Sequence, residues 1–478
     1  MKKEISRRDF LKYGVVTSAA VSAAAVLAGC GNGAAATTAA ATTADLPTEA
    51  PTTESPAESA LTEMPSDGSG KVSNKYYRVS GANMNVYTPE IIGQNAKIVV
   101  ASMHGGLSRS LEQKFLKQLA AFGFITAYCV PDSASFPEQF KAMNNCMKTL
   151  RELDGVEKIV LMGQSRGAAV MSAYQKIAEN GVSVYQGADR RLPFPDMELE
   201  PADGLMLLDA NFGFMVMHMM SMNPAIQDED HPLEWDPELN AILPENGYAP
   251  DGKCDYSDEF KAKFLKAQRA RYMKLLDMAE ERWQLIQSGK GKFTDNEPFI
   301  IPDCIGTNNS PKLFAGDLKY FSRTKEAWPL IHPDGSITNE IIPCLRVDEN
   351  NPTAAGTTGA AFQTTVKDFL WMELEVGEDY DYGEDYLNGI NFESSFTCSS
   401  GNVKMITCPL LLMGHTAGYE FITAEWSYNN AISKDKTIAF TEGATHGWST
   451  IDKDKYGDTI LTEAKYVTGW LTEKGRFI

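Results

Sequence analysis

Apolar residues in the first half of the chain form short continuous runs, and longer amphipathic stretches separate these runs. The short runs are typical of strands buried on both faces, and the amphipathic stretches have the period of helices. Strands that alternate with helices predict a parallel sheet with helices on both faces. The predicted strands are residues 96–103, 124–130, 158–162, 204–208, 409–414 and 436–440, and the predicted helices are 111–121, 136–153, a helix after residue 168, and 459–471.

This pattern stops near residue 211 and resumes near residue 404, with little strand character in between. Residues 258–287 form a long run with apolar residues at helical spacing and many Lys, Arg and Glu residues. The sequence therefore predicts an α/β core made of residues 73–211 and 404–478. A large, mainly helical cap, residues 212–403, is inserted between the sixth and seventh strands.

The predicted strand at 158–162 leads directly into Gly-Gln-Ser-Arg-Gly at 163–167, and a helical pattern follows. A serine on a sharp turn between a strand and a helix is exposed above the sheet, in the arrangement called a nucleophile elbow. Glycines suit this turn because a Cβ would obstruct the close backbone approach. Ser165 is therefore the candidate nucleophile.

Two other loops follow predicted strands. Residues 104–106, His-Gly-Gly, come after the first strand of the parallel series, and a glycine-rich exit of this kind can present backbone N–H groups to an oxyanion. His446 lies in a Gly-Ala-Thr-His-Gly loop after the strand at 436–440. A histidine in that position is a candidate general base.

The elbow at 163–167, the His-Gly-Gly loop and the His446 loop together resemble the α/β-hydrolase superfamily, over residues from about 76 to the C-terminus. The closer resemblance is to secreted or lipoprotein hydrolases of bacteria that carry a cap. This resemblance implies an α/β-hydrolase fold and a triad with Ser165 as nucleophile and His446 as base. The N–H groups of Gly105, Gly106 and Arg166 would form the oxyanion hole, and no metal or organic cofactor is required.

Three carboxylates are candidates for the acid of the triad. No aspartate follows the strand at 409–414, but Glu420 lies in the next loop, where the family places its acid, and is the first choice. Glu425 falls within the following helix. Asp209 ends the preceding strand, and its alternative role is that of a turn or N-cap residue.

Residues 1–29 are typical of an export signal. A twin arginine, Arg7 and Arg8, precedes an alanine-rich apolar stretch, which ends in a lipobox-like Leu-Ala-Gly-Cys at 27–30. Cys30 is the expected lipidation site. We therefore expect an exported protein, attached through its lipid to the outer face of the cytoplasmic membrane or cell envelope.

Residues 30–72 are rich in Ala, Thr, Pro and Ser and have almost no large apolar side chains, so we expect a disordered tether. The formal net charge of the whole chain is −19. Removing residues 1–29 takes away five basic and two acidic residues, which gives −22. Such an acidic chain argues against a nucleic-acid partner.

Seven cysteines remain once Cys30 is assigned to lipid, and the pair Cys304–Cys344 is the first candidate for a disulfide. No spacing of Cys and His residues predicts a zinc site. The acidic run at 378–385 loosely resembles a calcium loop but lacks the twelfth-position glutamate, so a solvated loop is favoured.

The function expected from these features is hydrolysis of a small-molecule carboxylic ester through an acyl-enzyme. A peptidase of the same fold and a noncatalytic surface-binding lipoprotein are the alternatives. Residues 212–220 are rich in Met and Phe. Core packing is favoured for them, while Phe214 and Met215 are candidates for a substrate pocket.

Overall fold

The structure, a computed structural model, describes residues 66–105, 110–249, 254–304, 312–313, 318–346 and 361–478. The predicted export signal, Cys30, most of the predicted tether and Gly106 lie outside these residues.

The main sheet of the described residues has ten strands, in the order β1-β2-β4-β3-β5-β6-β13-β14-β8-β9. The strands from β4 to β8 in this order run parallel, whereas β1, β2 and β9 join their neighbours antiparallel. The bounds are β1 (Val72–Val79), β2 (Ala82–Pro89), β3 (Ile98–Ser102), β4 (Ile125–Pro131), β5 (Lys158–Ser165), β6 (Gly204–Ala210), β8 (Arg323–Ile331), β9 (Ile337–Pro343), β13 (Leu410–His415) and β14 (Lys436–Thr441).

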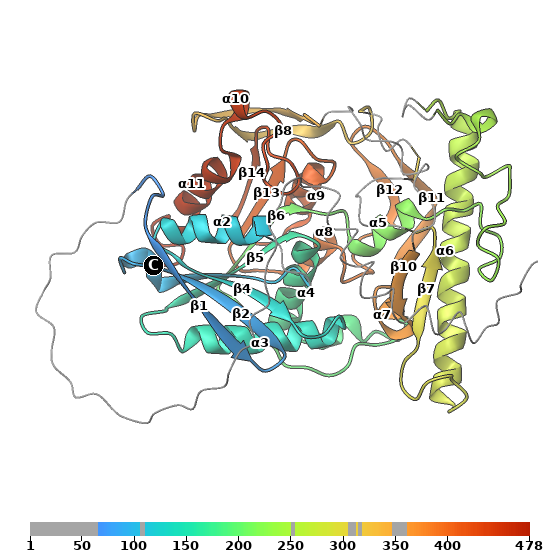
Figure 1. Ribbon diagram of the computed structural model, residues 1–478, viewed down its shortest axis with the longest axis horizontal. Helices are drawn as coiled ribbons and strands as arrows, with labels where there is room; N and C mark the ends of the chain where they lie inside the picture. Colours follow the sequence, from blue (N-terminus) through green and yellow to red (C-terminus); the bar gives the residue numbers. More distant parts are fainter. Residues whose placement is uncertain (1–65, 106–109, 250–253, 305–311, 314–317, 347–360) are drawn as a thin grey trace, which may run out of the picture. The chain divides into compact units, whose positions relative to one another are not determined.

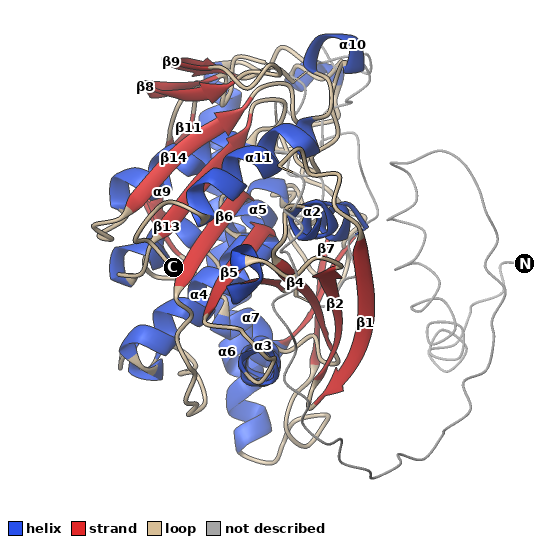
Figure 2. Ribbon diagram, turned by 90° about the vertical axis from the view of Figure 1, so that its left-hand side faces the viewer, coloured by secondary structure: helices blue, strands red, loops and turns tan. Residues whose placement is uncertain are grey.

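Helices cover both faces of this sheet, as the alternation of strands and helices predicted (Figure 2). Successive side chains of a strand point to opposite faces. Accordingly, Val99 and Ile159 belong to a hydrophobic core with α3 (Phe136–Arg151) and α4 (Arg166–Asn180). Val100 and Val160 belong to a second core with α2 (Ser110–Ala121) and α11 (Thr459–Leu471).

The segment between β6 and β13 contains more strand than the sequence predicted. Its long helix, α6 (Asp258–Gln287), has the predicted bounds. Its N-cap is Ser257, whose side chain accepts a hydrogen bond from the Phe260 N–H. However, the described part of residues 212–403 also contributes six strands. The segment comprises α5 (Phe214–Ser221), a 3-10 turn (Pro244–Asn246), α6, β7 (Pro298–Pro302), β8, β9, β10 (Ala361–Thr365), α7 (Val366–Trp371), β11 (Glu375–Tyr382), β12 (Leu387–Asn391) and α8 (Ser399–Asn402).

These additional strands form three antiparallel pairs. β8 and β9 extend the main sheet beside β14, β7 pairs with β10, and β11 pairs with β12. Figure 1 shows β11 alongside α6. The strands are short, and β7 begins and ends with proline, which usually argues against a strand but is tolerated at a sheet edge. The strand pattern in the sequence of these segments is therefore weaker than that of the core strands.

The seven cysteines that the structure describes are free thiols. The Cys304 sulfur lies 3.2 Å from the backbone oxygen of His218, and the Cys344 sulfur lies 3.2 Å from that of Gly418. The predicted pairing of Cys304 with Cys344 is wrong, because each thiol is held against a different part of the fold. In the described ranges we find no helix with both the length and the apolar character needed to cross a membrane.

Candidate active site

Ser165 lies at the junction of β5 and α4 in a strained backbone conformation, with φ 56° and ψ −126°. The turn leaves little room for a side chain on either side of Ser165. A Cβ on Gly163 would come 2.4 Å from the Gly167 oxygen, and a Cβ on Gly167 would come 3.2 Å from the Met103 oxygen. The geometry of a nucleophile elbow, predicted from the sequence, is thus present at Ser165.

A chain of hydrogen bonds connects Ser165 to a histidine and a carboxylate. The Ser165 Oγ and His446 Nε2 atoms are 2.7 Å apart, and the other ring nitrogen of His446, Nδ1, lies 2.6 Å from Asp209 Oδ2. The Asp209 carboxylate accepts a hydrogen bond from Nδ1–H, which leaves the lone pair of Nε2 facing the serine hydroxyl. The three side chains come from β5, β6 and the loop after β14.

The carboxylate hydrogen-bonded to His446 is that of Asp209, whereas the sequence favoured Glu420. Glu420 is the second carboxylate, with Oε2 3.6 Å from His446 Nδ1, beyond hydrogen-bond distance. Asp209 is further fixed by the His415 backbone N–H, which donates to Oδ1 at 2.8 Å. Geometry therefore favours the third candidate over the first.

Glu425, the second candidate, points away from the histidine. Its carboxylate accepts hydrogen bonds from the backbone N–H groups of Lys325 and Glu326 and from the Trp328 indole, at 2.8 to 3.0 Å. Glu425 thus ties α9 (Thr423–Asn430) to β8, and this full set of partners explains its burial without a catalytic role.

Burial raises the pKa of Glu420 to about 7, and the charge of Asp209 adds to this effect while His446 opposes it. For His446, burial alone would lower the pKa, but the Glu420 and Asp209 carboxylates outweigh it, so the pKa is raised. Two carboxylates beside one imidazole therefore make His446 a stronger base.

The predicted oxyanion loop follows β3 and includes Gly105, which has a φ of +88° that favours glycine. The Arg166 side chain donates a hydrogen bond from Nη1 to the Gly105 oxygen. Its guanidinium packs against two aromatic rings, 4.9 Å from the centre of Phe136 and 4.7 Å from that of Phe214. Burial lowers the pKa of Arg166 to about 10. Gly105 is thus held next to the elbow, and Gly106 lies outside the described residues.

The two candidates for a substrate pocket differ in their surroundings. Phe214 is partly exposed and packs against the Arg166 guanidinium and the His218 ring, whose centre is 4.6 Å away. Met215 is completely buried in the hydrophobic core. Of the two, Phe214 alone has the exposure that contact with a ligand requires.

Two residues of this site were not identified in the sequence. Gln164 donates a hydrogen bond from Nε2 to the His446 backbone oxygen at 2.6 Å and so fixes the loop that carries the base. His415, the last residue of β13, lies behind Asp209. The position of Gln164 beside the elbow serine was the available signal, while nothing local distinguished His415.

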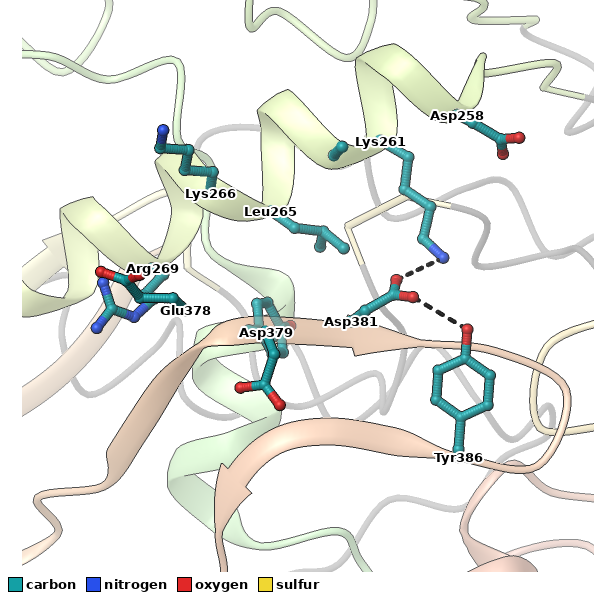
Figure 3. Close-up of a pocket in the computed structure, with 11 residues that line it drawn as sticks. Asp258, Lys261, Leu265, Lys266, Arg269, Glu378, Asp379, Asp381 and Tyr386 are labelled. Atoms are coloured by element: carbon teal, nitrogen blue, oxygen red, sulfur yellow. Dashed lines mark hydrogen bonds and ion pairs between the residues drawn. The ribbon is translucent and has the colours of Figure 1, made fainter.

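The acidic run at 378–385 forms most of β11 and the following turn, and lines a cavity of about 660 Å³ against α6. Figure 3 shows Lys261 pointing from α6 to Asp381, with their charged atoms 2.8 Å apart. The Tyr386 hydroxyl donates to the other Asp381 oxygen at 3.0 Å. Asp381 is therefore occupied by protein partners, and the residues lining this cavity include none of the Ser165, His446 and Asp209 group.

Asp209, Glu420 and His446 bring possible metal-ligating atoms within 4.8 Å of one another. Two ligands of one tetrahedral zinc ion, each about 2.0 to 2.1 Å from the metal, would be about 3.3 Å apart. The 2.6 Å separation between His446 Nδ1 and Asp209 Oδ2 is instead that of a hydrogen bond. These atoms fit a hydrogen-bonded pair better than a shared metal.

Serine, aspartate and histidine follow one another along the chain at Ser165, Asp209 and His446, and the serine lies on an elbow after a central parallel strand. The fold is that of an α/β-hydrolase.

Comparisons with known proteins add little to this assignment. No family model and no curated protein matches the chain. Among solved structures, a hypothetical protein from Pseudomonas aeruginosa is similar at 13% identity and a TM-score of 0.39, over 86% of this chain and 98% of the other. Brefeldin A esterase, described as a bacterial homologue of human hormone-sensitive lipase, is similar at 9% identity and a TM-score of 0.38, over 87% of this chain and 80% of the other. A soluble variant of monoglyceride lipase from Saccharomyces cerevisiae is similar at 8% identity and a TM-score of 0.38, over 88% of this chain and 100% of the other. Scores this low carry no argument about the activity of this protein.

Proposed function

We propose that this protein is a serine hydrolase that cleaves small carboxylic esters through an acyl-enzyme. The observation that carries the proposal is the hydrogen-bonded series Ser165–His446–Asp209, with separations of 2.7 and 2.6 Å. A serine hydroxyl is a poor nucleophile at neutral pH unless a base takes its proton during attack. An elbow serine facing a carboxylate-oriented imidazole meets that requirement.

In the proposed reaction, Ser165 Oγ attacks the ester carbonyl while His446 Nε2 takes the hydroxyl proton. Asp209 stabilises the imidazolium that forms. The backbone N–H of Arg166 and those of the Gly105–Gly106 loop stabilise the tetrahedral oxyanion. His446 then protonates the departing alcohol, and a water molecule, activated by the same imidazole, hydrolyses the acyl-enzyme and restores Ser165.

Labelling with a fluorophosphonate probe tests the nucleophile. We expect the probe to modify Ser165, and we expect Ser165→Ala to abolish labelling and lower kcat by roughly 10⁶-fold with little change in Tm. Ser183→Ala, at an exposed serine, is the matched control and should label normally. Labelling that persists in Ser165→Ala, or no labelling of the wild type, would contradict the proposal. The second result would favour a noncatalytic binding protein.

A substrate panel distinguishes the two enzyme classes. Nitrophenyl esters with acyl chains of increasing length are compared with aminoacyl nitroanilides at equal concentration. We expect hydrolysis of the esters to dominate, while preferential hydrolysis of the anilides would establish a peptidase.

We further propose that the protein is exported and anchored by a lipid on Cys30. The twin arginine at residues 7 and 8 and the Leu-Ala-Gly-Cys sequence at 27–30 support this proposal. Cys30→Ser should release the protein from the membrane fraction, because the acyl chains on Cys30 supply the attachment. Fractionation followed by immunoblotting measures the release. Retention of the Cys30→Ser protein in the membrane fraction would argue against a lipid anchor.

A further inference from the structure

A second histidine, His415, is completely buried behind the triad, and each of its ring nitrogens lies close to an oxygen atom. Nδ1 lies 2.9 Å from the Thr445 backbone oxygen, and Nε2 lies 2.8 Å from Glu463 Oε2. A backbone carbonyl has no proton to give. A neutral imidazole carries one N–H and would leave the lone pair of its other ring nitrogen against an oxygen, so the surroundings favour the doubly protonated imidazolium.

The partner of Nε2, Glu463, has the surroundings of an ionised carboxylate. Its Oε1 accepts a hydrogen bond from the Trp448 indole N–H at 2.7 Å, and its Oε2 accepts one from the Thr441 hydroxyl at 2.7 Å. Because both oxygens accept donors from the protein, the negative charge of Glu463 is stabilised, and with it the positive charge of His415.

His415 also faces the acid of the triad. Its backbone N–H donates to Asp209 Oδ1, and its ring nitrogen Nδ1 is 3.7 Å from Asp209 Oδ2. The charged groups that face His415 are thus Glu463 from α11 and Asp209 from β6. An imidazolium in this position attracts the same carboxylate oxygen that accepts the hydrogen bond from His446.

The triad has an excess of negative charge that this cation offsets. His446 is faced by Asp209 from β6 and by Glu420 from the loop after β13, and both favour its protonated form. A general base must be neutral before it can take the serine proton. The positive charge of His415 acts in the opposite direction on His446.

We propose, as an extension of the proposed hydrolase function, that His415 is a protonated positioning residue, which holds Asp209 and partly offsets the negative charge beside His446, so that His446 loses its proton at a lower pH than Asp209 and Glu420 alone would allow. Burial alone would lower the pKa of His415, but the Glu463 and Asp209 carboxylates outweigh it and raise that pKa to about 9. This shift agrees with the charge that the two acceptors already indicate.

The charge itself is tested by NMR on the wild-type chain labelled with ¹⁵N-histidine. The chain has six histidines. At pH 8 we expect one buried imidazole with both ring nitrogens protonated, whose signals are absent from His415→Gln. This readout does not depend on the enzyme being a hydrolase. No imidazole of this kind at pH 8 would overturn the proposal.

The effect on the base is tested by the pH dependence of kcat/KM for a nitrophenyl ester. Removing a positive charge near His446 makes its imidazolium easier to form. His415→Gln should therefore move the ascending limb of the kcat/KM profile to higher pH by about one unit. At the acidic end this shift lowers kcat/KM by about tenfold, while kcat/KM on the alkaline plateau stays within a fewfold of the wild type.

His231→Gln is the matched control, because His231 is an exposed histidine paired with Asp228 at 2.8 Å. The ascending limb of the kcat/KM profile of this variant should not move. A uniform loss in His415→Gln with an unmoved limb would mean that His415 only supports packing and would overturn the proposal. If His415→Gln does not fold, the wild-type NMR measurement still decides the charge. A wild type with the doubly protonated imidazole but no esterase activity would count against the proposed function and not against the charge of His415.

Discussion

At the scale of single residues, the position of Asp209 in the sheet explains why its carboxylate, and not that of Glu420, is hydrogen-bonded to His446. β6 lies between β5 and β13 in the sheet, so its last residues are next to both the elbow and the end of β13. Asp209 has a positive φ of 46°, an uncommon conformation for a residue other than glycine. This strained end of β6 brings the carboxylate within reach of His446 and of the His415 N–H.

Substitutions of the three carboxylates should separate their contributions. Asp209→Asn should lower kcat by about 10⁴-fold, because the amide no longer holds the correct tautomer of His446. Glu420→Gln should keep kcat within about tenfold and move the ascending limb of the pH profile to lower pH, because one of the charges that stabilise the His446 imidazolium is gone. Steady-state kinetics across pH measures both effects.

Glu425→Gln is the matched control for this series, because Glu425 is buried and hydrogen-bonded but points to β8. Its kcat should change little. If Glu420→Gln proves more damaging than Asp209→Asn in folded protein, the acid is Glu420 and the assignment from the structure fails.

At the scale of elements, α5 combines a packing residue and a candidate ligand-contacting residue at adjacent positions. Met215 is enclosed by the core, and its backbone N–H donates to the Thr397 hydroxyl. Phe214 turns instead to the guanidinium of Arg166, the residue after the nucleophile. The Met- and Phe-rich pattern of this helix therefore serves two purposes, and position along the helix decides between them.

Alanine substitutions in α5 should distinguish the two positions. Met215→Ala should lower the free energy of unfolding by about 2 to 5 kcal/mol and affect all esters equally, because it leaves a cavity in the core. Phe214→Ala should change the preference among acyl chain lengths more than the hydrolysis of an acetyl ester. Denaturant unfolding and kcat/KM for the ester series measure the two effects. A uniform loss on all esters in Phe214→Ala would mean that Phe214 only packs.

At the scale of the whole molecule, the buried ionisable groups around the triad connect the site to global stability. The native pKa of His415, about 9, exceeds its ordinary value of 6.5, and that of Glu420, about 7, exceeds 4.5. A raised native pKa means that the folded state binds more protons than the unfolded state. The stabilisation from His415 is therefore complete below pH 6.5 and is lost as the pH rises through 9. The stabilisation from Glu420 is complete below pH 4.5 and is lost as the pH rises through 7.

Unfolding by urea at a series of pH values tests this linkage. Between pH 6.5 and 9 the free energy of unfolding of the wild type should fall, and that of His415→Gln should fall less steeply, because the titrating imidazole is gone. His231→Gln, with its exposed pair, should follow the wild type. Parallel curves for the wild type and His415→Gln would show that His415 has no raised native pKa.

The sequence by itself determined the α/β alternation, the bounds of α6, the elbow at Ser165 and the loop that carries His446. Each of these depends on residues close together in the chain, through strand and helix periodicity or through glycines beside one serine. The short strands between β6 and β13 were missed because brief alternations and flanking prolines give a weak local signal.

Only the tertiary structure decided which carboxylate meets the base and which residues lie behind it. Asp209 and His446 are 237 positions apart. Their contact depends on the order in which β5, β6, β13 and β14 lie in the sheet. The same is true of His415, whose surroundings come from β6, the His446 loop and α11. Periodicity specifies the face of a strand or helix that a residue occupies. The distance between two side chains that are far apart in the sequence, and the electrostatic interaction between them, are set only after the strands have paired.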